Sequence, residues 1–269
     1  MVTTRTELTS EAIRIIETKS GPILKAETVS GGFNSEIAAI VHTSEKSLFV
    51  KGLRANHRRV WTQQAEARIS PYLQGVAPAL LWQEESSGWN LLAFEHVQGR
   101  HAEYGAGSDD LPVIVSCMRR LQQIDCPDVP LKQAEERLRS YVDDPADASL
   151  FAGPALLHTD WNRKNLLIET GRVHLVDWAW ATRGAAWIDP AGWLVWLMAE
   201  GGQTAKQAEE WAARIPSWQT APTDAVRAYA NANARLWAEI ASADPDEWTS
   251  RMASAAEDWA HHRRGGSNP

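Results

Sequence analysis

Four polar side chains in one short region of this 269-residue chain have the types and spacing to act together on a cation and a hydroxyl group. Asp160 follows His158 by two residues, and Asn165 follows Asp160 by five. Asp177 comes twelve residues later, after a tight connection that contains Gly171. The apolar runs around them predict two short strands, whose loops would bring three oxygen-bearing side chains together. Such oxygen atoms suit a hard cation beside a reacting hydroxyl.

A lysine at the end of an apolar run is a second candidate. Lys51 follows Ser47-Leu48-Phe49-Val50, and strand alternation would turn it to the same face as Phe49. A lysine that points inward needs an anion, and Glu66 in the helical segment 57–69 is a candidate partner. The alternative reading, in which both side chains are exposed, fits the isolated segments equally well.

The turn at residues 30–35 is a third candidate, because it contains Gly31, Gly32 and Ser35 between two expected strands. Glycine permits close backbone approach and positive φ, so this turn could present N–H groups to a phosphate. A Gly-Gly pair between strands is also typical of an ordinary hairpin, and the turn alone does not decide between them.

The elements that must position these residues change in type along the chain. The first part predicts an antiparallel β region, with strands at residues 23–30, 36–42, 47–51, 78–84 and 89–94 and helices at 10–18 and 57–69. Beyond a polar stretch at 95–100, helical patterns dominate, at residues 111–124, 131–141, 191–199, 206–215, 223–241 and 245–261. We therefore expect an α+β fold with an N-terminal lobe at 1–95, a hinge at 95–100 and an α-rich lobe at 101–269.

Composition excludes several classes of protein. With 44% hydrophobic residues the chain can build a core, and its net charge of −7 argues against a nucleic-acid or polybasic membrane-binding role. Cys117 and Cys126 match neither a zinc spacing nor a disulfide framework. No apolar run approaches the roughly 20 residues of a transmembrane helix, and residues 1–5 lack a signal-peptide pattern. These features predict a soluble, cytoplasmic protein.

The charge is uneven along the chain. Residues 1–100 hold 11 Lys+Arg and 10 Asp+Glu, which leaves 16 and 24 for residues 101–269. Most of the 14 tryptophans also lie in this acidic part. Solvated helix faces and ordinary packing would explain both features. The functional alternative is a pocket for a cation, in which some tryptophans stack and some carboxylates, among Glu200, Glu239, Glu247 and Asp258, attract the ligand.

The order of these parts resembles that of the kinase-like phosphotransferases, and most closely the aminoglycoside phosphotransferase and choline kinase group. The resemblance rests on Lys51 in the β-rich part, on a following helix with a glutamate, and on the pattern His158-x-Asp160-x4-Asn165 with a later Asp177. It covers nearly the whole chain. It implies a bilobal protein-kinase-like fold and an ATP- and Mg²⁺-dependent transfer of phosphate to a hydroxyl.

Within that resemblance each residue has an implied role. Asp177 and Asn165 would bind Mg²⁺, Asp160 would orient and deprotonate the attacking hydroxyl, and His158 would brace the loop. The glycine turn would cover the phosphates, Lys51 held by Glu66 would contact them, and the hinge would offer backbone groups to adenine. The residues implied in nucleotide binding are Lys51, Glu66, Gly31, Gly32, Ser35, Glu95 and Val97. Asp189 matches a family aspartate that ties down the catalytic loop.

Three departures from the family pattern stand out. Thr159 replaces the usual glycine of His-Gly-Asp, Asp177-Trp178-Ala179 lacks the glycine of the protein-kinase Asp-Phe-Gly, and the phosphate turn lacks a full GxGxxG pattern. The segment between Asp177 and Asp189 is also too short to present a peptide substrate. We therefore expect a small hydroxylated acceptor, with no nucleic-acid or membrane partner, and a monomer or homodimer.

The hypotheses differ mainly in the molecule that accepts the phosphate. A cationic compound such as an aminoglycoside or amino sugar, in an antibiotic-inactivating role, comes first. A choline, ethanolamine or homoserine kinase is the alternative, and a non-catalytic nucleotide-binding protein is the non-enzymatic rival.

Overall fold

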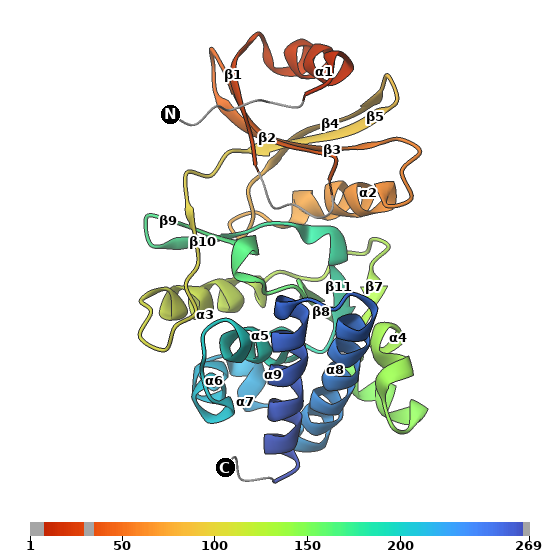
Figure 1. Cartoon of the computed structure of the whole chain (residues 1–269), viewed down its shortest axis with the longest axis vertical. Coiled ribbons are helices and arrows are strands. Elements are labelled where there is room, and N and C mark those ends of the chain that lie inside the picture. The colour runs from red at the N-terminus through yellow and green to blue at the C-terminus, as the bar shows by residue number, and fades with distance from the viewer. Residues whose placement is uncertain (1–7, 30–34, 266–269) are drawn as a thin grey trace. The chain divides into compact units, whose positions relative to one another are not determined.

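A five-stranded antiparallel sheet forms the first of two units into which the chain folds (Figure 1). This computed structural model describes residues 8–29 and 35–265. The first unit contains the residues up to Gln98 together with Asp177–Ala179, and the second contains Gly99–Val176 and the residues from Trp180 onward.

The sheet of the first unit has the strand order β1-β2-β3-β5-β4, with every neighbouring pair antiparallel. Its elements are β1 (Ile23–Thr28), β2 (Ile37–Thr43), β3 (Ser47–Arg54), β4 (Leu80–Ser86) and β5 (Trp89–Glu95), with helices α1 (Ser10–Ser20) and α2 (Val60–Ile69) and a short 3-10 turn at Ser70–Tyr72. The five strands and both helices that the sequence predicts here are confirmed, with ends shifted by a few residues. Helix α1 is capped by the Thr9 side chain, which accepts from the N–H of Ala12.

The two faces of this sheet serve different purposes. One face packs its alternate residues, among them Val41, Leu48 and Val50, against Ala12 and Ile16 of helix α1 in a buried core. Lys51 is the next residue after Val50 in β3, so its side chain lies on the opposite face. Helix α2 contacts β3 and β5, and its Glu66 meets Lys51 on that second face. Strand alternation therefore places the lysine between sheet and helix.

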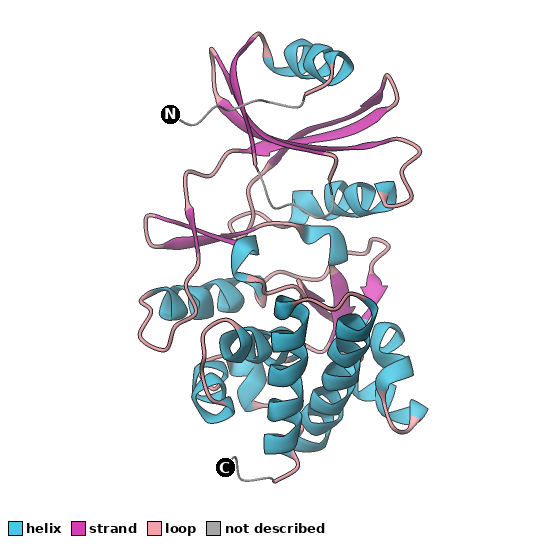
Figure 2. Cartoon of the chain, in the orientation of Figure 1, coloured by secondary structure: helices cyan, strands magenta, loops and turns pink. Residues whose placement is uncertain are grey.

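The second unit is rich in helices, as the colouring by secondary structure shows (Figure 2). Its helices are α3 (Asp110–Leu121), α4 (Ala134–Leu138), α5 (Ile188–Ala199), α6 (Ala205–Ala212), α7 (Pro216–Gln219), α8 (Thr223–Ala243) and α9 (Glu247–Arg263). Helices α5, α8 and α9 pack on one another around buried Trp193 and Trp259. The α+β fold class predicted from the sequence is confirmed.

Two small sheets complete the second unit. One has the order β10-β9-β6 and consists of β6 (Arg100–His101), β9 (Leu166–Glu169) and β10 (Arg172–Leu175). The other has the order β7-β11-β8 and consists of β7 (Lys132–Gln133), β8 (Ala155–Leu157) and β11 (Thr182–Gly184). The 131–141 segment that the sequence predicts as one helix is instead β7, the short helix α4 and a 3-10 turn.

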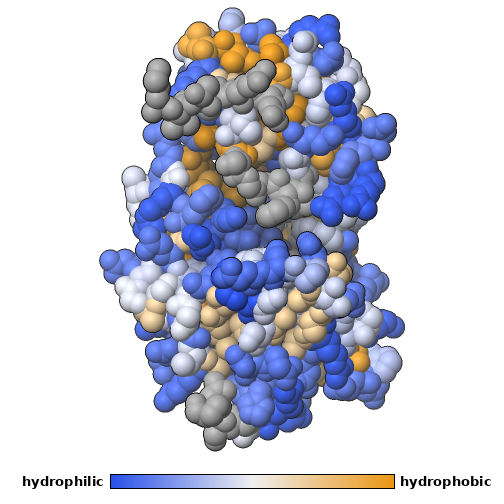
Figure 3. Space-filling view, in the orientation of Figure 1, coloured by the Kyte–Doolittle hydropathy of each residue, from blue (hydrophilic) through white to orange (hydrophobic). Residues whose placement is uncertain are grey.

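The visible face of the second unit is largely hydrophilic (Figure 3). Some exposed carboxylates of this unit pair with arginines of the same helix, as Glu247 does with Arg251 and Asp224 with Arg227. These carboxylates are therefore part of a solvated helix surface. No helix in the described part of the chain has the length and apolarity needed to cross a membrane.

Candidate functional site

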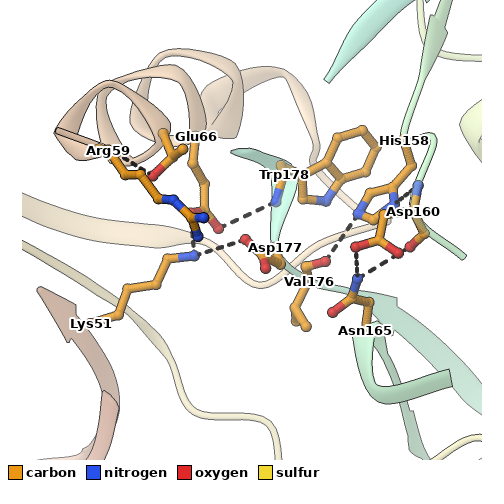
Figure 4. A network of polar contacts seen from close by, with 10 residues as sticks. Lys51, Arg59, Glu66, His158, Asp160, Asn165, Val176, Asp177 and Trp178 are labelled. Atoms are coloured by element: carbon orange, nitrogen blue, oxygen red, sulfur yellow. Dashed lines mark hydrogen bonds and ion pairs between the residues drawn. The ribbon is translucent and has the colours of Figure 1, made fainter. Parts of the chain in front are cut away.

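Lys51 and Glu66 form an ion pair within the first unit (Figure 4). The Lys51 side chain is 12% exposed and that of Glu66 only 5%. Burial alone would lower the pKa of Lys51, but the carboxylates of Glu66 and Asp177 outweigh it and raise that pKa above its usual value. The lysine is therefore a charged, mostly buried donor, which corresponds to the inward-facing alternative of the two that the isolated segments left open.

Asp177 is the second acidic neighbour of this lysine. Its Oδ1 lies 3.3 Å from Lys51 Nζ, and its side chain is 28% exposed. The backbone of Asp177 has a φ of 62°, in the left-handed region that Asp tolerates better than most residues. The next residue, Trp178, donates its N–H to Glu66 Oε1 at 3.4 Å. Glu66 thus holds both the lysine and the backbone that follows Asp177.

In the second unit, a loop between β8 and β9 carries His158, Asp160 and Asn165 (Figure 4). Asn165 donates through Nδ2 to Oδ2 of Asp160 at 2.9 Å and to its backbone carbonyl at 3.2 Å. His158 is fully buried; its Nδ1 accepts the N–H of Asp160 at 3.2 Å, and its Nε2 lies 3.0 Å from the carbonyl of Val176. Both ring nitrogens are therefore used by the backbone, which suits a bracing role.

The loop also fixes the backbone that precedes Asp177. Val176 donates its N–H to the carbonyl of Asn165 at 2.9 Å, and its own carbonyl faces His158. The peptide groups of Val176 are thus held by two residues of the loop. Because Asp177 is the next residue in the chain, a single peptide bond joins the loop's hydrogen-bond network to that of Lys51.

Asp189 anchors the start of the loop. Its two carboxylate oxygens accept the N–H groups of His158 at 2.9 Å and Thr159 at 2.8 Å, and the residue is 3% exposed. Burial raises its pKa, which the two N–H donors oppose. Asp189 lies in the first turn of α5, so it ties the loop to a helix of the core. This is the tethering role that the family resemblance implies.

Thr159 occupies the position where the family usually has glycine, and its φ is 66°. A β-branched residue rarely adopts this left-handed conformation. Glycine would adopt this conformation without strain, so Thr159 needs other contacts to hold it there.

The residues implied in nucleotide binding lie in three places. Gly31 and Gly32 lie outside the described residues, and Ser35 is half-buried just before β2. Glu95 ends β5 and donates its N–H to the carbonyl of Ala79 at 2.9 Å, so its carbonyl is the backbone group it could offer to adenine. Val97 follows in the segment that leads out of the first unit.

The predicted metal ligands are one carboxylate and one amide. Among residues 8–29 and 35–265, no group of three or more His, Cys, Asp or Glu side chains is arranged to hold a metal ion. Mg²⁺ is usually held by one or two protein oxygens together with substrate phosphates and water. Asn165 faces two acceptor oxygens with Nδ2, which leaves Oδ1 for a cation, and Asp177 is partly exposed. Each of these two side chains, taken by itself, therefore offers an oxygen of the kind that Mg²⁺ binds together with phosphate.

Three tryptophans gather beside a buried carboxylate in the second unit, which sequence reasoning could not single out. The rings of Trp196, Trp237 and Trp248 have centroids 5.6–5.9 Å apart. Glu200 accepts from Trp248 Nε1 at 3.3 Å, and its Oε2 lies 3.1 Å from Nε of Arg163, a residue of the Asp160 loop. The Glu200 side chain is 13% exposed, whereas Glu239, Glu247 and Asp258 are exposed.

Tyr104 is a further contact of the loop that the sequence did not indicate. Its buried hydroxyl donates to the carbonyl of Trp161, the residue after Asp160, and burial raises its pKa well above the usual value. Gln203 in turn donates to the carbonyl of Tyr104 at 2.8 Å. These contacts span long sequence separations, so no local pattern could have revealed them.

No family model and no curated protein sequence matches this chain. Solved structures do resemble it. Choline kinase LicA from Streptococcus pneumoniae aligns with a TM-score of 0.67 at 15% identity, over 94% of this chain and all of that one. Aminoglycoside phosphotransferase APH(4)-Ia, in complex with AMP-PNP and hygromycin B, gives 0.65 at 15% identity, over 97% and 100%. Spectinomycin phosphotransferase APH(9)-Ia, with ADP and spectinomycin, gives 0.55 at 11% identity, over 98% and 96%.

The chain therefore has the protein-kinase-like fold of the choline kinase and aminoglycoside phosphotransferase structures. The resemblance that the sequence motifs indicate is confirmed at the level of the fold. At these identities the likeness concerns the fold alone.

Proposed function

We propose that this protein is an ATP-dependent phosphotransferase that phosphorylates a hydroxyl group of a small cationic molecule. The observation that carries the proposal is the Lys51 ion pair with Glu66, with Asp177 only 3.3 Å from the same lysine. A buried, charged lysine beside a partly exposed aspartate is suited to binding phosphate and its counter-cation. The similar structures contain ADP or AMP-PNP, which supports nucleotide use.

The residues of the two networks divide the chemistry between them. Lys51 donates to phosphate oxygens and is kept in place by Glu66. Asp177 and Asn165 would supply oxygen ligands for Mg²⁺, which would neutralise charge on the phosphates. Asp160 accepts a hydrogen bond from the acceptor hydroxyl and aligns it for attack. It takes the proton as the bond from that oxygen to the γ-phosphorus forms and the bond from the γ-phosphorus to ADP breaks. His158 and Asp189 hold the loop without touching the reacting groups.

Charge and aromatic surface support a cationic acceptor. Glu200 is a mostly buried carboxylate that contacts both Trp248 and the loop residue Arg163. Carboxylates attract amines, and tryptophan faces attract ammonium groups and stack on sugar rings. An aminoglycoside or amino sugar is the first candidate, which implies an antibiotic-inactivating role. Two of the similar structures contain hygromycin B and spectinomycin.

A compact alkylammonium alcohol is the second candidate. The packing of Trp196, Trp237 and Trp248 against one another favours it, because a small aromatic cluster with one carboxylate matches a single quaternary ammonium group. The similarity to a choline kinase agrees with this reading.

A panel of acceptors tests the proposal. Purified protein with Mg-ATP is incubated with aminoglycosides, amino sugars, macrolides, peptide antibiotics, choline, ethanolamine and homoserine, and ATP consumption and phosphorylated product are measured. The proposal expects acceptor-dependent ADP formation with at least one cationic alcohol. Binding of ATP without turnover of any acceptor would instead indicate a non-catalytic nucleotide-binding protein.

A further inference from the structure

Arg137 in the short helix α4 makes hydrogen bonds that reach the Asp160 loop. Its Nη1 donates to Thr159 Oγ1 at 2.7 Å and to Thr182 Oγ1 at 2.7 Å. Both hydroxyls also face the carbonyl of Trp180, at 3.3 Å from Thr159 and 2.8 Å from Thr182. One guanidinium nitrogen therefore joins two threonines that share a single acceptor.

This arrangement coincides with the strained residue of the loop. Thr159 has a φ of 66°, and Asp160 follows it directly. Hydrogen bonds that exist only in this conformation are what can keep a β-branched residue there. Asp189 accepts the N–H of Thr159, and Arg137 donates to its hydroxyl. Both the backbone and the side chain of Thr159 are therefore held by hydrogen bonds.

The elements that carry Arg137 are attached to the loop by strand pairing. Thr182 of β11 pairs with Lys132 of β7, the strand that leads into α4, and with Leu157 of β8, the residue before His158. The Arg137 guanidinium also lies 5.3 Å from the ring centroid of Trp180. The arginine is thus held on a frame that is continuous with the start of the loop.

Arg137 is a half-buried cation. Burial lowers the pKa of its guanidinium, and the charges of Tyr229, Asp189 and Asp160 oppose that shift. The hydrogen bonds to the two threonines therefore also help to offset the burial of this side chain.

We propose that Arg137 is a positioning residue, which holds Thr159 in its left-handed conformation and thereby sets the direction of Asp160. The inference rests on the proposed function, because it assigns Arg137 to the alignment of the acceptor hydroxyl and not to nucleotide binding.

The test is a double-mutant cycle of Arg137→Met and Thr159→Gly, with an acceptor that the wild-type protein phosphorylates. We expect Arg137→Met to lower kcat by about 10- to 100-fold, the cost of a small misplacement in the site. The KM for ATP should stay within about two-fold of the wild-type value, because nucleotide contacts are untouched. Thr159→Gly should have little effect by itself and should restore most of the kcat in the Arg137→Met background, since glycine adopts positive φ without strain.

Two further variants separate positioning from folding. Arg137→Lys keeps a charged donor that can reach both hydroxyls, and it should retain most of the kcat. Arg183→Met is the matched control, because Arg183 is a half-buried arginine of β11 whose side chain donates to the carbonyl of Pro127. It should leave kcat unchanged.

Thermal unfolding gives a readout that does not depend on turnover. Thr159→Gly should raise the Tm of Arg137→Met but not that of the wild type, because only the former has strain without a compensating bond. An equal Tm shift in both backgrounds, an unchanged kcat in Arg137→Met, or a lost kcat that Thr159→Gly does not restore would each overturn the inference. A wild-type protein that phosphorylates no acceptor overturns the proposed function instead, and the Tm comparison still decides whether Arg137 offsets the strain at Thr159.

Discussion

Lys51 lies 3.3 Å from Asp177 while it also pairs with Glu66, so one ammonium group serves two carboxylates that differ in exposure. Glu66 is nearly inaccessible and depends on the lysine to offset its burial. Asp177 is more exposed and can exchange the lysine for another cation without leaving a buried charge. By their exposure, Glu66 is a structural partner of Lys51, whereas Asp177 can also bind a ligand.

Replacing this lysine should affect nucleotide binding and stability in separable ways. Lys51→Met should raise the KM for ATP by about 10- to 100-fold, because a charge-assisted hydrogen bond contributes about 1.5–3 kcal/mol. It should also destabilise the protein by about 3–5 kcal/mol, because Glu66 is left buried and unpaired. The measurements are ATP titration of the initial rate and urea-induced unfolding.

A double variant distinguishes the two effects. Lys51→Met/Glu66→Gln removes the unpaired charge, so it should recover much of the stability but none of the ATP affinity. Arg54→Met is the control on the same strand, because Arg54 is exposed. Its guanidinium carbon lies 4.0 Å from the centroid of the Trp89 ring. If the double variant binds ATP like the wild type, Lys51 has no role in phosphate recognition.

Asp160→Asn tests the assignment of the acceptor-aligning carboxylate. General-base residues contribute about 10²–10⁴-fold to rate, so kcat should fall within that range while the KM for ATP changes little. Asparagine keeps an oxygen that can accept from Nδ2 of Asn165, so the loop contact at 2.9 Å should survive. Rates are measured under single-turnover and steady-state conditions. A kcat within a factor of about two of the wild type would remove Asp160 from the reaction.

Local patterns predicted much of this protein correctly. Strand alternation around Lys51 indicated its face, and the helix after it was predicted at 57–69 and lies at Val60–Ile69. The spacing of His158, Asp160, Asn165 and Asp177 indicated the kind of fold before any contact was known. These patterns involve residues that are close together in the sequence. Few other folds need these residue types in this order.

Other features depend on contacts that no local pattern encodes. Arg137 lies in the 131–141 segment that the sequence predicts as one helix, yet its helix ends at Leu138 and its side chain reaches Thr159. Strands β6, β7, β8 and β11 are two or three residues long, too short for a period to appear. The tryptophans near Glu200 could not be chosen among 14, because ring packing is decided by tertiary structure.

Glu200→Gln tests the acceptor site. If Glu200 attracts an ammonium group, the substitution should raise the acceptor KM by about 10-fold, within the range expected for losing a hydrogen bond to a charged group. The KM for ATP should not change. If Glu200 only holds the loop through Arg163, kcat should fall and the acceptor KM should stay constant. In the first case, Trp237→Ala should also raise the acceptor KM. Trp211→Ala is the control, because Trp211 is a half-buried tryptophan of α6.

The buried thiol of Cys117 should make the stability of the protein depend on pH in the alkaline range. Burial raises the pKa of Cys117 from 9.0 to about 12, and the residue is fully buried in helix α3. Between these values the unfolded chain loses the thiol proton while the native protein keeps it. Stability is therefore fully present below pH 9 and decreases as the pH rises toward 12, by up to about 1.4 kcal/mol per pH unit.

Cys117→Ala should flatten this dependence. The free energy of unfolding, measured by urea titration from pH 7 to pH 10.5, should fall less steeply in the variant than in the wild type, although a constant offset from the lost sulfur is expected. Cys126→Ala is the matched control: its thiol is half-exposed, so its removal should change the slope less. Thiol titration of the native protein should likewise modify Cys126 and leave Cys117 protected until the chain unfolds. Parallel pH profiles for Cys117→Ala and the wild type would show that this thiol ionises equally in the native and unfolded states.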